Sequence, residues 1–366
     1  MVKTVKKVLF VTSFHPDGAG NIGAGEAISG DNIRRLQAAG TEVHVFCVAP
    51  NDQRASTSLR QACASYTVCP RTSGQTLLAM VKNVFRGSLF APWFFTRVSP
   101  HTIARLQAVM AEVRPDEVWF DFPSSLGFVC YVEAPKKVYI AHDVVSQKIR
   151  RSLLKRLAAP MVSRVEAALL NKLSRLVVLS DKDRQLAQEL GFAGDIDIWP
   201  PSHPRVGTVD DSVSIDTVVS RFGERANMVF FGHMGRAENH WSMVLFILGC
   251  YGKIRRACPD VRLWIVGIQP RVSLRLLGKI VPGVEVVGAV DDPSKAFVKS
   301  TVCIAPILFG AGVKIKVLQM LDAGASVVAT PAGAEGIMAN ERLTVVDWAQ
   351  LPTKLIAVLK ERRVDA

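Results

Sequence analysis

The sequence lacks the features that mark three common classes of protein. Its seven cysteines are odd in number and form no C-x-x-C pair, which excludes a disulfide scaffold and the usual zinc sites. No apolar run reaches the roughly 18 residues that a bilayer-spanning helix needs. No secretory signal is recognisable, because the basic and apolar segment 2–13 alternates like a strand and continues into a glycine-rich loop. We therefore expect a protein of a reducing compartment with a cytoplasmic localisation.

Positive charge is present in large excess. The net charge of +13 and the sequence pI of about 9.6 favour anionic partners such as nucleic acid, acidic lipid or phosphorylated substrates. No zinc-finger or RNA-recognition motif can be read, and the basic residues interleave with apolar ones at helical spacing. We therefore expect no nucleic-acid partner and favour a membrane surface; the alternative is a solvated basic surface.

The order of predicted strands and helices indicates two α/β domains. Apolar strands are predicted at 7–12, 42–48, 66–69, 117–120, 137–141, 175–179 and 195–199, with a long helix within 146–174. A second series is predicted at 228–232, 261–266, 284–287, 301–305, 326–329 and 343–346. The prediction is a domain at 1–200, a proline-rich linker at 201–226, a domain at 227–350 and a closing helix at 351–366. Two doubly wound parallel sheets should face each other across a ligand-binding cleft.

The strongest candidate for a binding site is a glycine turn in the segment 305–330. A buried strand is followed there by a G-A-G turn and a predicted helix with two lysines in its first turn. Glycine lets backbone amides approach a ligand, and a helix amino terminus attracts anions, so the pattern predicts a pyrophosphate site. The alternative is a loop that merely needs glycine. The candidate residues are Gly310, Ala311, Gly312, Lys314 and Lys316.

The same segment resembles the carboxy-terminal domain of the retaining GT-B glycosyltransferases of family 4. Their branch pattern PxxxGaGxxiKvlEalaaGxPVVaTpxGaeG is matched at Pro306, Gly310, Gly312, Lys316, Gly324, Val327, Val328, Thr330, Gly333, Glu335 and Gly336. The resemblance extends over 228–346. It implies a GT-B fold and a bound nucleoside-diphosphate sugar, with 310–316 holding the diphosphate and Glu335 and Gly336 near the sugar or the base.

The sequence departs from this family at the helix after the glycine turn. Many members carry two glutamates eight positions apart, where this chain has Ala311 and Gln319. The resemblance implies that Gln319 contacts the ribose, since an amide can hydrogen-bond a diol without a charge. Many members also carry an arginine and a lysine after the first strand of this domain, which have no clear counterpart here. His233, Arg236 or Lys314 is expected to take their place.

Two segments of the first half carry the other candidates. Gly18 and Gly20 lie in the loop 14–25, which resembles the family's amino-terminal loop over donor phosphate and acceptor; the alternative is a flexible surface loop. His142 and Asp143 follow the strand 137–141, where active-site groups gather in parallel sheets. The resemblance implies that His142 contacts a sugar hydroxyl and carries a proton. Asp143 either orients that ring or caps the next helix.

A surface for the acceptor or a membrane is predicted in the first half. The segment 80–98 mixes basic and aromatic residues, and 148–175 carries basic residues among leucines. A basic amphipathic helix beside an aromatic cluster can lie on an anionic bilayer. For the aromatic residues alone, a place in the core is the favoured alternative. The residues assigned to this surface are Trp93, Arg150, Arg151 and Lys155.

The resemblance implies a nucleotide-sugar-dependent, hexosyltransferase-like enzyme that retains anomeric configuration. The expected partners are a nucleoside-diphosphate sugar, which is a substrate and not a cofactor, and a glycan or lipid-linked acceptor in polysaccharide or lipopolysaccharide biosynthesis. No metal is expected, since no D-x-D motif stands at a plausible strand end, and Lys316 with the loop amides would stabilise the leaving phosphate. Two alternatives stay open: a non-catalytic nucleotide-sugar-binding or regulatory subunit, and a GT-B-like nucleotide-sugar epimerase.

Overall fold

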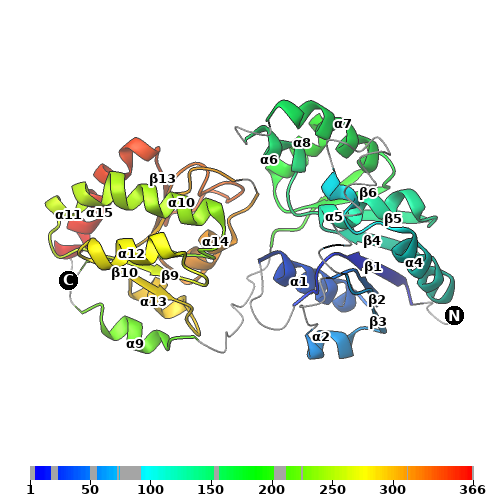
Figure 1. The fold of residues 1–366 in the computed structure, drawn as a ribbon, viewed down its shortest axis with the longest axis horizontal. Coiled ribbons are helices and arrows are strands. Elements are labelled where there is room, and N and C mark those ends of the chain that lie inside the picture. Colours follow the sequence, from blue (N-terminus) through cyan, green and yellow to red (C-terminus); the bar gives the residue numbers. More distant parts are fainter. Residues whose placement is uncertain are drawn as a thin grey trace. The chain divides into compact units, whose positions relative to one another are not determined.

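The computed structural model describes residues 5–17, 24–49, 56–71, 74, 92–151, 156–201, 212–223, 226–310 and 312–364. The chain divides into two compact units, Met1–Pro204 and Arg205–Ala366. Each unit is a parallel sheet with helices on both faces (Figure 1). The predicted fold class of two doubly wound parallel α/β domains is confirmed.

The first unit is built on a seven-stranded sheet in the order β3-β2-β1-β4-β5-β6-β7. Its strands are β1 Lys7–Thr12, β2 Glu42–Cys47, β3 Ser65–Val68, β4 Glu117–Asp121, β5 Lys136–Ala141, β6 Arg175–Val178 and β7 Asp195–Ile198. Its helices are α1 Ala24–Ala38, α2 Thr57–Ala62, α4 Pro100–Val113, α5 Pro123–Leu126, α6 Val145–Arg150, α7 Ala159–Leu170 and α8 Asp181–Glu189, with 3₁₀ turns η2 Pro92–Phe95, η3 Gly127–Tyr131 and η4 Arg156–Ala158. All five residues of β4 are buried, as expected for a central strand covered on both faces.

The second unit is built on a six-stranded sheet in the order β10-β9-β8-β11-β12-β13. Its strands are β8 Asn227–Phe231, β9 Arg262–Val266, β10 Val284–Gly288, β11 Val302–Ala305, β12 Val327–Ala329 and β13 Leu343–Val345. Its helices are α9 Ile215–Ser220, α10 Ala237–Phe246, α11 Gly252–Ala257, α12 Val272–Ile280, α13 Ser294–Lys299, α14 Ile315–Asp322 and α15 Leu351–Val364, with a π-turn η5 Ile247–Tyr251 and a 3₁₀ turn η6 Trp348–Gln350. The direction of winding reverses between β8 and β11, as it does between β1 and β4 in the first unit.

The long helix predicted within 146–174 is not continuous, which corrects that expectation. The chain forms α6, the turn η4 and then α7. Pro160 is the second residue of α7. In the interior of one long helix its ring would clash with the carbonyl four residues earlier and remove a hydrogen bond, so a new helix starts there instead.

Part of the segment predicted as a linker packs into the second unit. Ile215, Val218 and Phe222, on and just after α9, are buried in its core. The backbone N–H of Ile215 donates to Asp291 Oδ1 at 2.8 Å, which ties the start of α9 to the loop after β10. The closing helix α15 likewise belongs to this unit by its packing, since three leucines that share one face are buried in the core: Leu351, Leu355 and Leu359.

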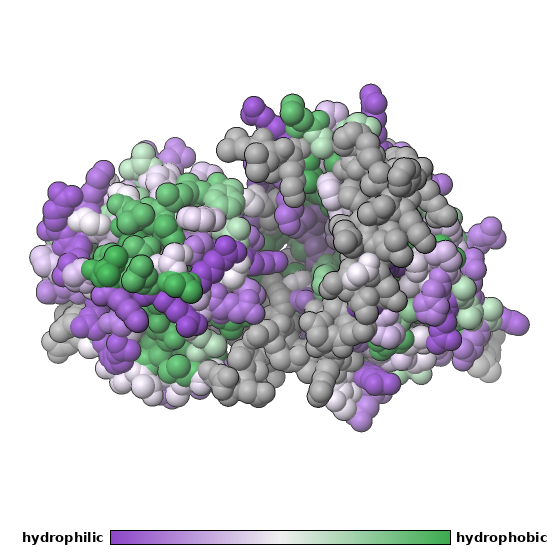
Figure 2. Space-filling model, in the orientation of Figure 1, coloured by the Kyte–Doolittle hydropathy of each residue, from purple (hydrophilic) through white to green (hydrophobic). Residues whose placement is uncertain are grey.

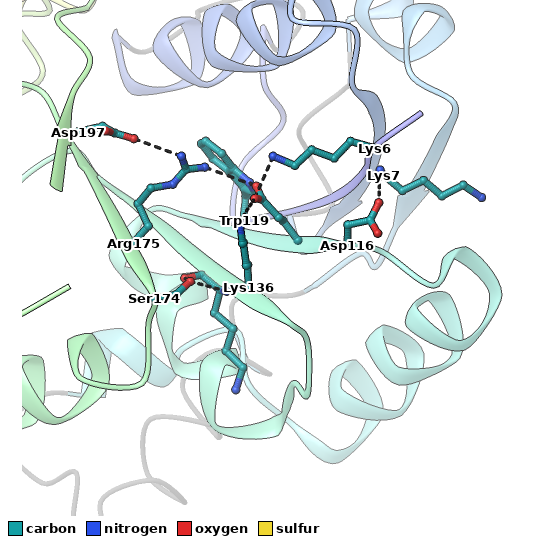
Figure 3. A network of polar contacts seen from close by, with 10 residues as sticks. Lys6, Lys7, Asp116, Trp119, Lys136, Ser174, Arg175 and Asp197 are labelled. Atoms are coloured by element: carbon teal, nitrogen blue, oxygen red, sulfur yellow. Dashed lines mark hydrogen bonds and ion pairs between the residues drawn. The ribbon is translucent and has the colours of Figure 1, made fainter. Parts of the chain in front are cut away.

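A buried carboxylate holds the amino ends of the first sheet together (Figure 3). Glu117, at the start of β4, accepts hydrogen bonds from Lys6 Nζ and Trp119 Nε1, both at 2.9 Å, and Arg175 lies 3.5 Å away. Burial raises the pKa of Glu117, but the hydrogen bonds from Lys6 and Trp119 outweigh it and leave the pKa below its usual value. The network lies at the end of the sheet opposite to that where ligands bind, so its role is structural.

Candidate functional site

Polar side chains gather at the carboxyl ends of both sheets, at the points where the winding reverses. In the first unit they follow β1, β4 and β5. In the second they come from α10, which follows β8, and from α14, which follows β11. Such reversal points are where open α/β sheets bind ligands, because the neighbouring connections leave the sheet on opposite faces.

Asp121 is the centre of the first group. It is the last residue of β4, is completely buried, and accepts a hydrogen bond from His142 Nε2 at 2.7 Å on one carboxylate oxygen. The other oxygen accepts from Ser29 Oγ at 2.6 Å and Thr12 Oγ1 at 3.0 Å. A carboxylate only accepts hydrogen bonds, so the proton of a neutral His142 ring lies on Nε2. Nδ1 is then the ring's acceptor, suited to a hydroxyl donor.

The His142 ring is also held by an aromatic neighbour. Phe122 stacks on the imidazole with centroids 4.4 Å apart and planes within 3°. Phe122 has φ of +67°, a conformation that a non-glycine residue adopts only at a cost of order 1–3 kcal/mol. His142 retains about 10% side-chain exposure. Stacking and the Asp121 hydrogen bond together leave the ring one orientation, a feature typical of positioned functional groups.

Two carboxylates from other elements contact the His142 ring and the start of α6. The ring of His142 is oriented by Asp121, as described above. The start of α6 is capped by Glu166 of α7, whose two carboxylate oxygens accept from the backbone N–H groups of Val145 and Ser146, each at 2.8 Å. Burial raises the pKa of Glu166, and hydrogen bonding by the Ser146 side chain and by these two backbone groups partly offsets the effect. The structure thus shows Asp121 and Glu166 in these contacts, and the two roles expected for Asp143 stay predictions.

Lys316 is the centre of the second group. Its Nζ donates to Asn239 Oδ1 at 2.6 Å and lies 4.4 Å from the centre of the Phe230 ring. Burial lowers the pKa of Lys316 to about 7, and the nearby Lys314 lowers it further, while Glu238 acts in the opposite sense. Among the described residues, no carboxylate forms a hydrogen bond with this ammonium. The positive charge of Lys316 is therefore poorly compensated by the protein, which favours the binding of an anion.

The glycine turn before α14 has the backbone that only glycine adopts readily. Gly310 has φ of +118° and Gly312 has φ of +78°. The helix starts at Ile315, with Lys314 at its N-cap and Lys316 in its first turn. Lys314 Nζ donates to Gly312 O at 2.8 Å and lies 3.9 Å from the buried carboxylate of Glu335. The structure thus brings Lys314 and Glu335 together.

The remaining second-unit candidates lie around this turn. Gln319 is partly buried on α14, one turn after Lys316, and Gly336 has φ of +75° just beyond Glu335. His233, after β8, accepts a hydrogen bond on its backbone oxygen from Asn239 Nδ2 at 2.9 Å. Burial, and secondarily Arg236, lowers the pKa of His233. Asn239 therefore connects His233 to Lys316.

Several predicted residues fall elsewhere. Outside the described residues lie Gly18, Gly20, Ala311, Lys155 and the part 80–91 of the basic and aromatic segment 80–98. Arg150 and Arg151 are exposed on and just after α6. Trp93 is partly buried against the first core, next to the fully buried Phe94. The core alternative for these aromatic residues fits this packing.

Sequence reasoning missed Asp121, Phe122, Asn239 and Phe230. Asp121 carried a usable signal, since it is an acid at the carboxyl end of a strand whose three middle residues are apolar. Asn239 and Phe230 carried none, because an asparagine in a helix and a phenylalanine in a strand have many ordinary roles. Their contribution depends on Lys316 lying beside them, 77 and 86 positions later in the chain.

Two doubly wound units, one of which carries a glycine turn beside a buried lysine, define a protein of the doubly wound α/β class. Comparison with known families is more specific. Residues 31–202 match a model described as Glycosyltransferase Family 4, and residues 225–361 match one described as Glycosyl transferases group 1. Together they span most of the chain. The chain therefore belongs to the glycosyltransferases with the GT-B fold.

Solved structures agree on the fold. HepE of Anabaena, crystallised with UDP, superposes with a TM-score of 0.65 at 13% identity, over 97% of this chain and 90% of that one. WaaG, a glycosyltransferase involved in lipopolysaccharide biosynthesis, gives 0.60 at 17% identity over 96% and 90%. Sucrose-phosphate synthase of Thermosynechococcus elongatus gives 0.62 at 16% over 98% and 90%. No curated protein matches the sequence significantly.

Within the described residues, no cluster of three or more His, Cys, Asp or Glu side chains is arranged to hold a metal ion. Within the same residues, no helix has the length and apolar character to cross a bilayer.

Proposed function

We propose that the protein transfers a sugar from a nucleoside-diphosphate sugar to a hydroxyl of a glycan or lipid-linked acceptor, with retention of configuration and without a metal. The observation that carries the proposal is the Lys316 site: an ammonium in apolar surroundings, next to a glycine turn and a helix amino terminus at a reversal point of the sheet. A diphosphate supplies the negative charge that this site lacks.

The roles of individual residues follow from their placement. Lys316 and the backbone of 310–316 would hold the diphosphate and stabilise the charge that develops on it as the glycosidic bond breaks. The acceptor proton would pass to the leaving phosphate, which needs no protein nucleophile. His142, with its Nδ1 as acceptor, would receive a hydrogen bond from a hydroxyl of the donor sugar. UDP in the HepE crystals supports a uridine nucleotide as the first donor to test.

A panel of UDP-, GDP- and dTDP-sugars tests the proposal. The matching donor should raise the melting temperature by several degrees at a concentration of about 100 times its Kd, and should be slowly hydrolysed. Hydrolysis supports a transferase. Stabilisation without turnover, even with lipid-linked acceptors, would point to a binding or regulatory subunit, and conversion of one sugar into another would point to an epimerase.

Gln319 is expected to contact the ribose of the donor. Gln319→Ala should raise the Kd of the donor about fivefold, the usual effect of losing one hydrogen bond. Gln319→Glu should retain the contact, since a carboxylate also accepts from a diol. Isothermal titration calorimetry measures both. Asp322→Ala, an exposed position one turn further along the same helix, is the matched control and should leave the Kd unchanged. Equal affinity in both Gln319 variants and the native protein would exclude the contact.

A further inference from the structure

The second unit exposes an apolar surface that the proposed reaction does not use. Six large apolar side chains project from α10, η5 and α12: Trp241, Leu245, Leu248, Val272, Leu276 and Ile280, which are 45–82% exposed. Figure 2 shows the corresponding hydrophobic area over α10 and α12. We call these six residues the apolar face. Scattered apolar residues are normal on protein surfaces, whereas a contiguous set on adjacent helices usually marks an interaction site.

The spacing of these residues explains why they form one surface. Val272, Leu276 and Ile280 are four positions apart and share one side of α12, while Leu274 on the other side is fully buried. Trp241, Leu245 and Leu248 form a similar row on the neighbouring helix. The two helices are in direct contact, with Ser273 Oγ 3.1 Å from His240 Nε2. The rows therefore lie side by side rather than on separate faces.

Every exposed charged side chain on α10, η5, α11 and α12 and at the cap of α12 is positive. They are Arg271, Arg275 and Lys279 at and along α12, and Lys253 and Arg256 on α11. The single acidic residue of these helices, all of which the structure describes, is Glu238; it is partly buried and lies 3.8 Å from Arg236. The surface thus combines aliphatic residues and a tryptophan with exposed charged side chains that are all lysine or arginine.

We propose that this face of the second unit, α10 to α12, docks on the surface of an anionic lipid bilayer. Helices that lie in a membrane interface have this composition, with Leu, Ile and Trp entering the acyl boundary and Lys and Arg contacting acidic headgroups. The basic segment of the first unit is a weaker candidate, since Leu157 and Met161 are the large apolar side chains exposed among its described residues. The inference goes beyond the proposed function and does not rest on it.

Sedimentation of the full chain with vesicles tests the proposal. The protein should bind vesicles of phosphatidylcholine with phosphatidylglycerol at low salt, and not vesicles of phosphatidylcholine alone. Leu245→Ser with Leu276→Ser should lower the partition coefficient more than tenfold. Arg275→Ser with Lys279→Ser should lower it by about fivefold per cation removed and weaken its salt dependence. Donor hydrolysis should stay at the native rate in each variant, which separates this proposal from the proposed function.

Matched substitutions control for general effects of losing apolar residues. Val298→Ser with Met338→Ser removes two exposed apolar side chains of the same unit outside the apolar face, and should not change vesicle binding. Melting temperatures confirm that each variant is folded. Three results would overturn the proposal: no binding to anionic vesicles, equal binding by the Leu245 and Leu276 variant, or loss of binding through Leu157→Ser alone. Light scattering that shows a dimer abolished by Leu245→Ser, with vesicle binding intact, would assign the face to a second copy instead.

Discussion

Replacement of Lys316 by methionine is expected to lower kcat for sugar transfer by about 10²–10³-fold, the effect typical of removing one group that stabilises developing charge. The Nζ of Lys316 contacts Asn239 and Phe230 and, among the residues that the structure describes, forms no hydrogen bond to a carboxylate. Methionine keeps most of the side-chain volume and removes the charge. A coupled assay for nucleotide release measures the rate. Lys299→Met, an exposed lysine of the same unit, is the control and should behave as the native protein.

The same lysine should make donor binding depend on pH. Burial lowers the pKa of Lys316 to about 7, and a bound diphosphate would raise that pKa. Above about pH 7, the neutral amine of Lys316 must therefore take up a proton when the donor binds. Affinity should be constant below about pH 7 and fall by up to tenfold per pH unit above it. Lys316→Arg, which stays charged, should remove the dependence. A native Kd that is constant between about pH 6 and pH 9 would contradict the assigned role.

Asp121→Asn is expected to lower kcat by about 10²-fold, with a smaller change in KM. The buried carboxylate fixes the orientation and tautomer of His142, and an asparagine can present its NH₂ group to Nε2 and move the ring proton to Nδ1. His142 would then offer a donor where the sugar hydroxyl needs an acceptor. Steady-state kinetics measures the loss. Ser29→Ala removes another hydrogen bond to Asp121 and should cost about 1 kcal/mol of stability with little effect on kcat.

A double-mutant cycle separates positioning from a merely structural role. If Asp121 acts through His142, Asp121→Asn should change kcat by less than about twofold in the His142→Ala background. Independent, multiplicative losses would mean that Asp121 supports the site by some other route. The pH profile of kcat is a second measure, because a changed tautomer alters the profile and a loss of stability does not.

The match between sequence and structure is closest where one segment contains all the relevant information. The glycine turn at 310–312 is such a case: a buried strand, glycines with positive φ and a lysine-bearing helix follow one another in 305–322. The alternation of strands and helices is another, since it leads directly to doubly wound sheets. The predicted long helix was wrong where a single residue, Pro160, mattered more than the apolar periodicity around it.

Contacts between distant segments were not predictable in the same way. The sequence offered ring orientation or helix capping as roles for Asp143. It did not indicate that Asp121, 21 positions before His142, holds the His142 ring because β4 and β5 are neighbours. The helix after His142 is capped by Glu166 from α7 and not by a neighbour in sequence. Adjacency in a parallel sheet is set by strand order, which local residue patterns do not specify.

Sequence alone therefore determined the class of fold, the family and the loop that binds the diphosphate in the proposed function, because these depend on local pattern and on a motif within one segment. Tertiary structure decided which partners tune the functional groups: Asp121 for His142, and Asn239 and Phe230 for Lys316. It also decided which apolar residues remain exposed, since the periodicity of α12 could not say whether Leu276 or Leu274 faces the core. Electrostatics and burial depend on what surrounds a group in space, and that is known only when the chain is folded.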